Sequence, residues 1–391
     1  MAHYFFTGWR CGSLPGSLRS GFFRMRVLFV ICGEGLGHTS RCLHLGHYLQ
    51  QHGHEVHFAG YGKSYDFMEQ HLCINLHVIS REVSLEGEGG FFSLKKTLWE
   101  SKWILRDMLK SYLDVRALLN KTKFDCVVCD TMYSSVLAAR FRRIPVVFIT
   151  NQNHFSGVGG KTNIVWKVLN FLIRRYLQLA SHVIVPDFPP PDTVAGYNIV
   201  IPDWEQERYT FTGPLFDLDP SRYVFSKKTI FTSFGGEPFK LPMYQMFREV
   251  ADRRKDLFFD VFYTGPVLPS SSNNFVAHGY VPNIFEHLAE AKVAIVHGGL
   301  TTLHEALLFE KPLLVIVDPN HPEQQNNAKK IVDMGAGIAV DGSNATSYLL
   351  ERALEKAAAL SQGPFFTRYG ALNGRQKAME IVENAAARKP S

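Results

Sequence analysis

The sequence predicts an α/β protein made of two doubly wound domains that face each other across a cleft. Short apolar runs alternate with longer segments of helical periodicity along most of the chain, which is typical of parallel sheets with helices on both faces. A proline-rich segment at Pro186 to Pro191 and a break at Gly213-Pro214 interrupt this alternation. A chain of 391 residues is long enough for two such domains.

The first series of strands is expected to begin with Val27 to Ile31, a continuous apolar run of the kind found in central parallel strands. A glycine-rich turn and a helical pattern that extends to Gln50 follow this run. The remaining strands of the series are expected at Val56 to Ala59, Ile74 to Ile79, Cys126 to Cys129, Val146 to Ile149 and Val183 to Val185.

The second series is expected to end with a helix over Ala371 to Ala387. Its strands are expected at Thr229 to Phe234, Phe258 to Tyr263, Val293 to Val296, Leu313 to Val317 and Ile338 to Val340. We therefore expect a first domain at residues 25–213, a second at residues 214–370 and a terminal helix within residues 371–391. Residues 1–24 are expected to be an extension, because Met25 would make a natural start.

The composition is typical of a globular protein. Hydrophobic residues make up 46% of the chain and charged residues 20%. No run of about 18 apolar residues appears, so we expect no transmembrane helix. The formal charge of +6 fits an anionic ligand or an anionic membrane face, and we expect no nucleic-acid partner.

The six cysteines are scattered, and several lie in apolar runs. Cys126 and Cys129 have the spacing of a redox pair, but positions three apart on a strand face opposite sides of a sheet. We therefore expect buried thiols in a reducing cytoplasm rather than zinc or redox chemistry.

The most informative segment is HGGLTTLHE, at residues 297–305. It is expected to form a strand end, a Gly-Gly turn and a helix N-terminus, whose unpaired N–H groups and dipole suit a diphosphate. Gly298 and Gly299 would let that anion approach the backbone closely. Thr302 and Glu305 share a helix face, and the Glu305 carboxylate can accept two hydrogen bonds from a ribose diol.

A second polar segment, EQQNNA at residues 323–328, opens the helical pattern that follows the expected strand Pro312 to Val317. Glu323 and Gln324 can hold the hydroxyl groups of a sugar. The two segments together offer groups for phosphate, ribose and sugar, which are the parts of a nucleotide-sugar. The alternative is an ordinary strand–helix unit with an accidental Gly-Gly pair.

The combined pattern, His-Gly-Gly-x-x-Thr-x-x-Glu followed by Glu-Gln-x-x-Asn-Ala, resembles the donor-binding signature of inverting glycosyltransferases with the GT-B fold. The similar groups are families 1 and 28, and the latter includes the lipid II N-acetylglucosaminyltransferase and glycolipid synthases. The resemblance implies two Rossmann-like domains, with the acceptor on the first and the donor on the second. It also implies that the terminal helix crosses back to the first domain.

The loop Gly33-x-Gly35-x-Gly37-His38 follows a strand and opens a helix. It is close to a dinucleotide fingerprint, but no acidic residue appears after the next strand until Asp66, so the pattern argues against NAD, and we expect no cofactor. In the similar glycosyltransferases this loop faces the cleft on the acceptor side, and a histidine there is often the general base. His38 matches that position, and imidazole suits proton abstraction at neutral pH. The alternative is a histidine that only caps or packs.

Asp130 follows the expected strand that ends at Cys129, at the edge where such sheets place their sites. It resembles the aspartate that orients the base in family 1. The alternative is that Asp130 only caps the next helix, which would begin at Thr131.

The resemblance assigns further donor contacts. The loop Ser233-Phe234-Gly235-Gly236 matches the second glycine-rich loop, so Ser233, Gly235 and Gly236 would contact the diphosphate, with His297 as a donor on the other side. Val281 stands where the backbone reads the nucleotide base. No Asp-x-Asp pair follows a strand, so we expect no metal and a leaving group stabilised by helix dipoles and amides.

Two helical stretches in the first domain, Phe91 to Tyr112 and Val165 to Leu179, are both apolar and basic. Such surfaces can lie on an anionic bilayer, and lipid-acceptor members of family 28 carry something similar. The basic residues chosen to test this idea are Lys95, Lys96, Arg174 and Arg175. The alternative is a pair of amphipathic helices that pack on the sheet and keep their charges in water.

The sequence therefore predicts an inverting transfer of sugar from a nucleoside diphosphate donor, with a UDP-sugar expected, to a hydroxyl acceptor that can be a membrane lipid. The protein would act in the cytoplasm, in part on the membrane face. Two alternatives are a nucleotide-sugar 2-epimerase of the same fold and a non-catalytic nucleotide-sugar-binding subunit.

Overall fold

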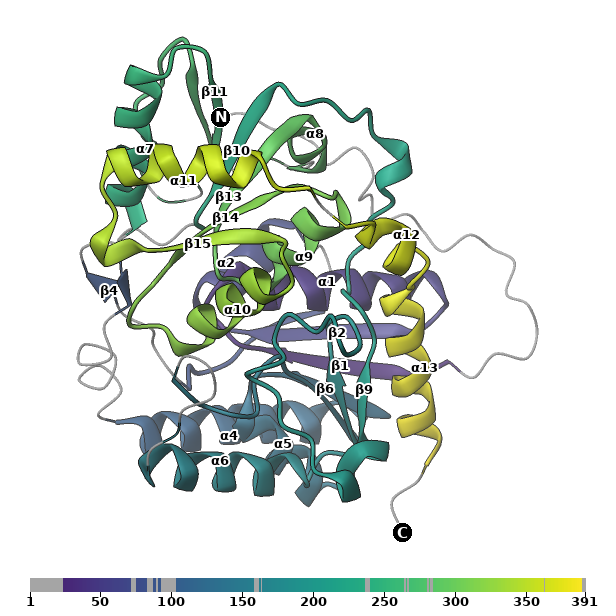
Figure 1. The fold of residues 1–391 in the computed structure, drawn as a ribbon. Coiled ribbons are helices and arrows are strands. Elements are labelled where there is room, and N and C mark those ends of the chain that lie inside the picture. The colour runs from purple at the N-terminus through teal and green to yellow at the C-terminus, as the bar shows by residue number, and fades with distance from the viewer. Residues whose placement is uncertain are drawn as a thin grey trace.

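The computed structural model describes most of the chain after residue 23. The described residues are 24–71, 75–82, 87–88, 91–92, 103–157, 162, 164–235, 240–263, 265, 267–279, 281, 284–361 and 363–388. Two parallel sheets dominate this part of the chain, one in each half (Figure 1). The expected extension, residues 1–24, lies outside it except for Arg24.

The first sheet has the strand order β3-β2-β1-β6-β7-β8-β9, and every pairing within it is parallel. The chain winds outward from β1 to β3 and then returns to the other side of β1 with β6. These strands are β1 (Arg26–Ile31), β2 (Glu55–Gly60), β3 (Leu76–Val78), β6 (Cys126–Asp130), β7 (Val146–Ile149), β8 (His182–Val185) and β9 (Tyr209–Phe211).

The second sheet repeats this winding in the order β12-β11-β10-β13-β14-β15, again with parallel pairs only. The chain leaves β10 toward β12 and returns to the other side of β10 with β13. These strands are β10 (Thr229–Ser233), β11 (Phe258–Phe262), β12 (Phe275–His278), β13 (Ala291–His297), β14 (Leu313–Val317) and β15 (Gly337–Asp341).

Helices connect most of the successive parallel strands. In the first half they are α1 (Leu36–Gln51), α2 (Gly62–His71), α4 (Ile104–Lys121), α5 (Tyr133–Phe141) and α6 (Ile164–Leu177). In the second half they are α7 (Leu241–Arg253), α8 (Ile284–Glu290), α9 (Leu300–Leu308) and α10 (Pro322–Asp333). Three further helices follow the last strand: α11 (Ser347–Ala358), α12 (Phe365–Tyr369) and α13 (Gly374–Ala387). Short 3-10 turns lie at Asp203–Arg208, Pro220–Arg222 and Gly342–Asn344.

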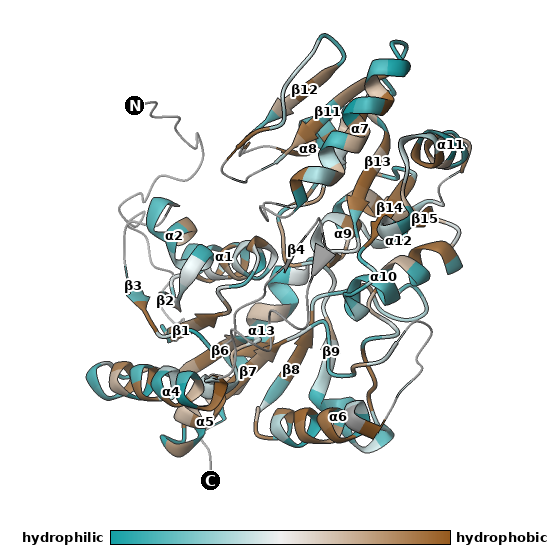
Figure 2. Ribbon diagram, turned by 90° about the vertical axis from the view of Figure 1, so that its left-hand side faces the viewer, coloured by the Kyte–Doolittle hydropathy of each residue, from teal (hydrophilic) through white to brown (hydrophobic). Residues whose placement is uncertain are grey.

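Both faces of the first sheet are buried, which explains why β1 is apolar from Val27 to Ile31. Val27, Phe29 and Ile31 pack toward α1 and α13, whereas Leu28 and Val30 pack toward the layer of α4, α5 and α6. That second layer lies along one side of the first sheet (Figure 2). Cys126 belongs to the first of these clusters and Cys129 to the second, so the pair faces opposite sides as expected. Both are buried free thiols.

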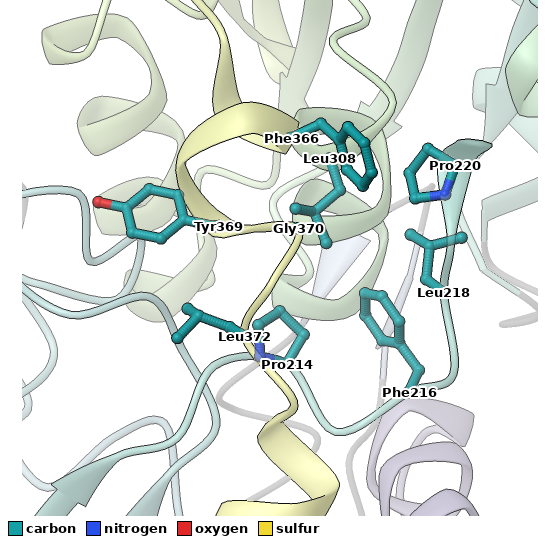
Figure 3. A pocket seen from close by; sticks show the side chains of 9 residues that line it. All are labelled: Pro214, Phe216, Leu218, Pro220, Leu308, Phe366, Tyr369, Gly370 and Leu372. Atoms are coloured by element: carbon teal, nitrogen blue, oxygen red, sulfur yellow. The ribbon is translucent and has the colours of Figure 1, made fainter.

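The last helix, α13, lies against the first sheet although it follows the second domain in the chain (Figure 1). Ala378, Met379 and Val382 share a core cluster with β1, β6 and α1. Gly374 makes this return possible, because a Cβ atom there would stand 2.2 Å from the backbone oxygen of Pro214. A small apolar pocket lies where the connection at Pro214 and Phe216 meets α12 and Leu372 (Figure 3).

The structure corrects two expectations about elements. Phe91 and Phe92 were expected to begin a helix, but they form β5, which pairs antiparallel with β4 (Gly87–Glu88), and the helix begins at Ile104. Strands β9 and β12 were not expected, because they are short strands at the edges of their sheets. No helix among the described residues combines the length and the hydropathy needed to cross a bilayer.

Candidate active site

Each sheet has one point at which the winding reverses, and the candidate residues gather at these two points. In the first sheet the reversal lies between β1 and β6, beside which stand His38 and Asp130. In the second it lies between β10 and β13, whose last residues are Ser233 and His297. The crevice outside such a reversal, at the carboxyl ends of the strands, is where open α/β sheets bind ligands.

His38 lies in the first turn of α1, which begins after Gly35. Gly35 has a φ of +84°, a conformation that L side chains rarely adopt, so glycine suits the turn that leads from β1 into α1. His38 Nδ1 lies 2.7 Å from Asp130 Oδ1, and the His38 side chain is 25% exposed whereas that of Asp130 is 0% exposed. The His38 imidazole is therefore held by a buried carboxylate and is itself partly exposed to solvent.

Asp130 is an ionised carboxylate in this environment. Burial raises the pKa of Asp130, but the charge of Arg41 and the contact with His38 outweigh burial and hold it well below its usual range. Two groups face His38 Nδ1: Asp130 Oδ1 at 2.7 Å and Arg41 Nη2 at 3.0 Å. An ionised carboxylate only accepts hydrogen bonds, so the shorter of these contacts assigns the proton to Nδ1. His38 Nε2 is then left with its lone pair, and no hydrogen bond reaches it from the described residues.

Arg41 clamps the same carboxylate from the next turn of α1. Its Nε lies 2.5 Å from Asp130 Oδ2, and its Nη2 lies 2.6 Å from Oδ1. Arg41 is buried, and its remaining nitrogen donates to Asn151 Oδ1 at 3.3 Å. Asn151 in turn donates to Glu323 Oε1 at 2.6 Å, which joins the first domain to α10 of the second.

Asp130 does not cap the following helix. The next residue, Thr131, has a φ of 55°, and α5 begins at Tyr133. The free N–H groups of Tyr133 and Ser134 donate to Glu82 instead, at 3.0 Å and 2.7 Å. The sequence-based alternative of a capping aspartate is therefore wrong.

The two glycine-rich loops of the second domain meet at His297. A Cβ atom on Gly299 would stand 2.5 Å from His297 Nε2, and one on Gly235 would stand 3.7 Å from its Cε1. Burial, with Lys240 and His321 nearby, lowers the pKa of His297 to about 3, so the imidazole is neutral. Its Nδ1 has no hydrogen-bond partner in the described part of the chain. Gly236 lies outside the described residues.

Helix α9 starts directly after these glycines, with Gly299 as its N-cap and no side-chain cap. Thr302 and Glu305 are both half-buried on this helix. Burial alone raises the pKa of Glu305 to about 8. Among the described residues no side chain or cation pairs with its carboxyl group, so a polar ligand could supply what the protein does not.

Gly298 and α10 are in close contact. A Cβ atom on Gly298 would stand 2.4 Å from the backbone oxygen of Gln324, so only glycine fits there. Asn327 Nδ2 donates to the Gly298 carbonyl at 2.9 Å. The buried Gln324 Oε1 has no partner within the described chain. These contacts hold the predicted phosphate and sugar residues in one place.

The two reversal points face each other across the domain interface. A Cβ atom on Gly37, in α1, would stand 3.2 Å from Thr301 Oγ1, in α9. The N-termini of α1 and α9 therefore meet, with His38 on one side and Gly298 and Gly299 on the other. Val281 is described, but no contact joins it to these residues; it packs against the main apolar core.

Sequence reasoning missed Arg41 and Asn151. Arg41 is three residues after His38 and so shares its helix face, which is a signal that was available. Asn151 stands two residues after the end of β7, at the same sheet edge as Asp130. Their partners are distant in the sequence: Arg41 pairs with Asp130, 89 positions away, and Asn151 pairs with Glu323, 172 positions away.

Comparisons with known proteins agree with this architecture. Residues 25–188 match the family model described as glycosyl transferase family 1, and residues 260–380 match the glycosyltransferase family 28 C-terminal domain. An uncharacterized glycosyltransferase of Methanosarcina acetivorans is 32% identical over 329 residues, which are 80% of this chain and 83% of the relative.

A more distant relative is the UDP-N-acetylglucosamine–N-acetylmuramyl-(pentapeptide) pyrophosphoryl-undecaprenol N-acetylglucosamine transferase of Thermosipho melanesiensis, 29% identical over 141 residues, which are 35% of this chain and 41% of the relative. Among solved structures, the calicheamicin glycosyltransferase CalG4 superimposes with a TM-score of 0.64 at 18% identity, over 95% of this chain and 100% of that one. That likeness confirms the predicted two-domain fold. The chain belongs to the GT-B glycosyltransferases of the family 28 and family 1 group.

Proposed function

We propose that this glycosyltransferase moves a sugar from a nucleoside diphosphate donor, a UDP-sugar, to a hydroxyl acceptor with inversion at the anomeric carbon. The observation that carries the proposal is the meeting of the His38–Asp130 pair with the Gly298–Gly299 helix N-terminus across the interface. A base and an anion site on opposite sides of one cleft suit direct displacement.

In this mechanism, His38 Nε2 takes the proton of the acceptor hydroxyl as its oxygen attacks the anomeric carbon. The bond from that carbon to the diphosphate oxygen breaks, and the nucleoside diphosphate leaves with the electron pair. Asp130 keeps Nδ1 protonated and stabilises the imidazolium that forms, as in other histidine–carboxylate pairs. One displacement step gives one inversion.

The leaving diphosphate would lie on the N-terminus of α9 and the β10 loop. The amides after Gly298 and the dipole of α9 offset its charge without a cation. Ser233, Gly235 and Thr302 would contact the same diphosphate. Because His297 is neutral, it would contribute a single N–H rather than a positive charge. Glu323 and Gln324 would hold the sugar.

The stereochemistry of the product tests the proposal directly. Purified protein is incubated with a panel of nucleotide-sugars and candidate acceptors, and the anomeric configuration of the product is read by proton NMR. An α-linked donor should give a β-linked product, and activity should survive excess EDTA. A product that retains the donor configuration, or an epimerised nucleotide-sugar formed without acceptor, would contradict the mechanism.

Donor binding should depend on pH through Glu305. The carboxyl group has a pKa of about 8 in the free protein, whereas a ribose diol needs the ionised form as acceptor. Below that pKa, ionisation opposes binding by up to about tenfold for each pH unit. Affinity for a UDP-sugar should therefore rise with pH up to the pKa and level off above it.

The Glu305→Gln variant is the matched test by calorimetry. It should lose about 1–3 kcal/mol of donor affinity above the pKa and show a flat pH profile. A nucleotide-sugar is the right probe, because its diphosphate diester does not titrate in this range. A variant with the wild-type profile would remove Glu305 from the ribose site.

The acceptor is proposed to be a membrane lipid. Large apolar side chains project from α4, α5 and α6, among them Leu105 (81% exposed), Phe141 (75%) and Ile164 (74%). The exposed basic residues Arg106, Lys110, Lys167 and Arg175 lie on α4 and α6. This combination suits the surface of an anionic bilayer. Lys95 and Lys96 lie outside the described residues.

Co-sedimentation with liposomes tests the membrane surface. Wild type should bind vesicles rich in anionic lipid more than neutral ones, and binding should fall as salt rises. Glutamate at Arg106, Lys110, Lys167 and Arg175 should weaken binding, because each basic residue contributes about 1 kcal/mol near such a surface. Reversal of Arg352 and Lys356 on α11 is the control. Wild type that stays in the supernatant at low salt would favour a soluble acceptor.

A further inference from the structure

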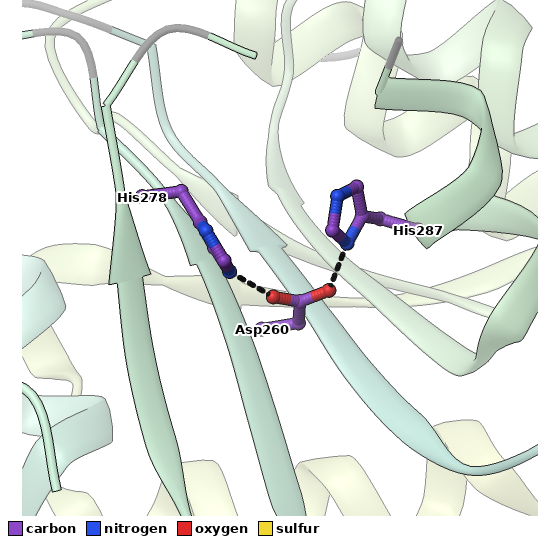
Figure 4. A group of neighbouring side chains, drawn as sticks. All are labelled: Asp260, His278 and His287. Atoms are coloured by element: carbon purple, nitrogen blue, oxygen red, sulfur yellow. Dashed lines mark hydrogen bonds and ion pairs between the residues drawn. The ribbon is translucent and has the colours of Figure 1, made fainter.

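Three side chains from separate elements of the second domain converge beside its sheet (Figure 4). Asp260 comes from β11, His278 from the end of β12 and His287 from α8. His278 Nε2 lies 2.5 Å from Asp260 Oδ1, and His287 Nδ1 lies 2.6 Å from Asp260 Oδ2. One nitrogen of each histidine and one carboxylate oxygen of Asp260 all fall within 4.8 Å of one another.

The Asp260 carboxylate is buried without a permanent positive charge beside it. Its side chain is 7% exposed, and no lysine or arginine forms an ion pair with it in the described part of the chain. A buried carboxylate needs compensation, and here only two imidazoles supply it. Both imidazoles are 29% exposed, so the cluster opens to solvent on the histidine side.

We propose that Asp260, His278 and His287 form a binding site for a divalent transition-metal ion of the zinc class. Two imidazole nitrogens and one carboxylate oxygen are a common ligand set for zinc, with water in the fourth position. The ion would replace the two hydrogen bonds to Asp260. Ligand atoms around a tetrahedral ion lie farther apart than those bonds, so the partly exposed imidazoles would turn outward while Asp260 stays fixed by the strand.

The site is separate from the proposed reaction. Asp260 lies on β11 and His278 at the end of β12, so neither belongs to the glycine-rich loops that follow β10 and β13. The ion would instead fix β12 to α8, the two elements that border Val281. Its role would be structural, and transfer chemistry at the diphosphate would still need no metal.

Zinc titration of the full chain tests the proposal. Protein stripped with EDTA and desalted is titrated with zinc chloride by calorimetry, and the rise in melting temperature with zinc is measured in parallel. Wild type should bind one ion per chain. His278→Gln and His287→Gln should bind at least about tenfold more weakly, since glutamine can keep a hydrogen bond to Asp260 but is a poor zinc ligand.

The chain offers a matched control in a second histidine pair, His57 and His77, whose ring nitrogens lie 3.0 Å apart. His77→Gln should leave zinc binding unchanged. Cobalt in place of zinc should give visible absorption bands without a thiolate charge-transfer band, which excludes the cysteines as ligands.

Equal zinc binding by wild type and His278→Gln, or no stoichiometric binding, would overturn the proposed site and leave a hydrogen-bonded triad. Donor binding is measured separately, so this outcome leaves the proposed function standing.

Discussion

Replacing His38 with alanine is expected to lower turnover about 10²–10⁴-fold and to leave donor affinity unchanged. The imidazole is the only group of the His38–Asp130–Arg41 cluster that both reaches solvent and presents a free lone pair, because Asp130 is fully buried and Arg41 is always protonated. The side chain is a quarter exposed, so its loss should change stability little.

Two variants make this result interpretable. His52→Ala, at the exposed far end of the same helix, should keep wild-type turnover. Asp130→Asn should lose turnover by a smaller factor, since the amide no longer fixes the proton on Nδ1. Its stability is measured beside turnover, because the buried Arg41 loses its counter-charge. Turnover is measured with saturating donor and acceptor, and donor affinity by calorimetry. Near-wild-type turnover of His38→Ala with the true acceptor would mean that another group removes the proton.

The strands that sequence alone predicts are those with long apolar runs. Val27 to Ile31 reads as a central strand because both of its faces are buried, by α1 and α13 on one side and by α4 to α6 on the other. The glycine-rich loops could also be predicted, since each is defined by glycines that lie within a few residues of one another in the sequence. Strand β12 was missed because Phe275–His278 is a short edge strand whose last three residues are only half-buried.

The parts that could not be predicted depend on contacts between distant segments. The helix expected from Phe91 was wrong because Phe91 and Phe92 pair with β4, and an amphipathic pattern does not reveal such a hairpin. Asp130 was recognised, but not the clamp by Arg41, and Glu323 was recognised, but not its bond to Asn151. The metal-ligand candidates Asp260, His278 and His287 stand on three elements and share no motif.

Replacing Arg41 with methionine should have the largest effect on stability. The change leaves the Asp130 carboxylate buried without its cation, which costs about 3–5 kcal/mol for comparable buried pairs. Turnover should fall as well, because His38 and Arg41 share Asp130 Oδ1 and the carboxylate would lose its fixed position. Arg41→Lys should be milder, since it keeps the charge but not the two-pronged contact.

The pH dependence of unfolding separates this explanation from simple loss of packing. In wild type the pKa of Asp130 is lowered, so its stabilising contribution is present above the unfolded pKa and is lost only in acid. Without Arg41, burial would raise that pKa instead, and the variant should become less stable as pH rises from the unfolded pKa toward the raised folded pKa. Adding Asp130→Asn removes the buried charge and should restore most of the lost free energy of unfolding. A double variant no more stable than Arg41→Met, with both independent of pH, would show that Arg41 acts through packing rather than through the charge of Asp130.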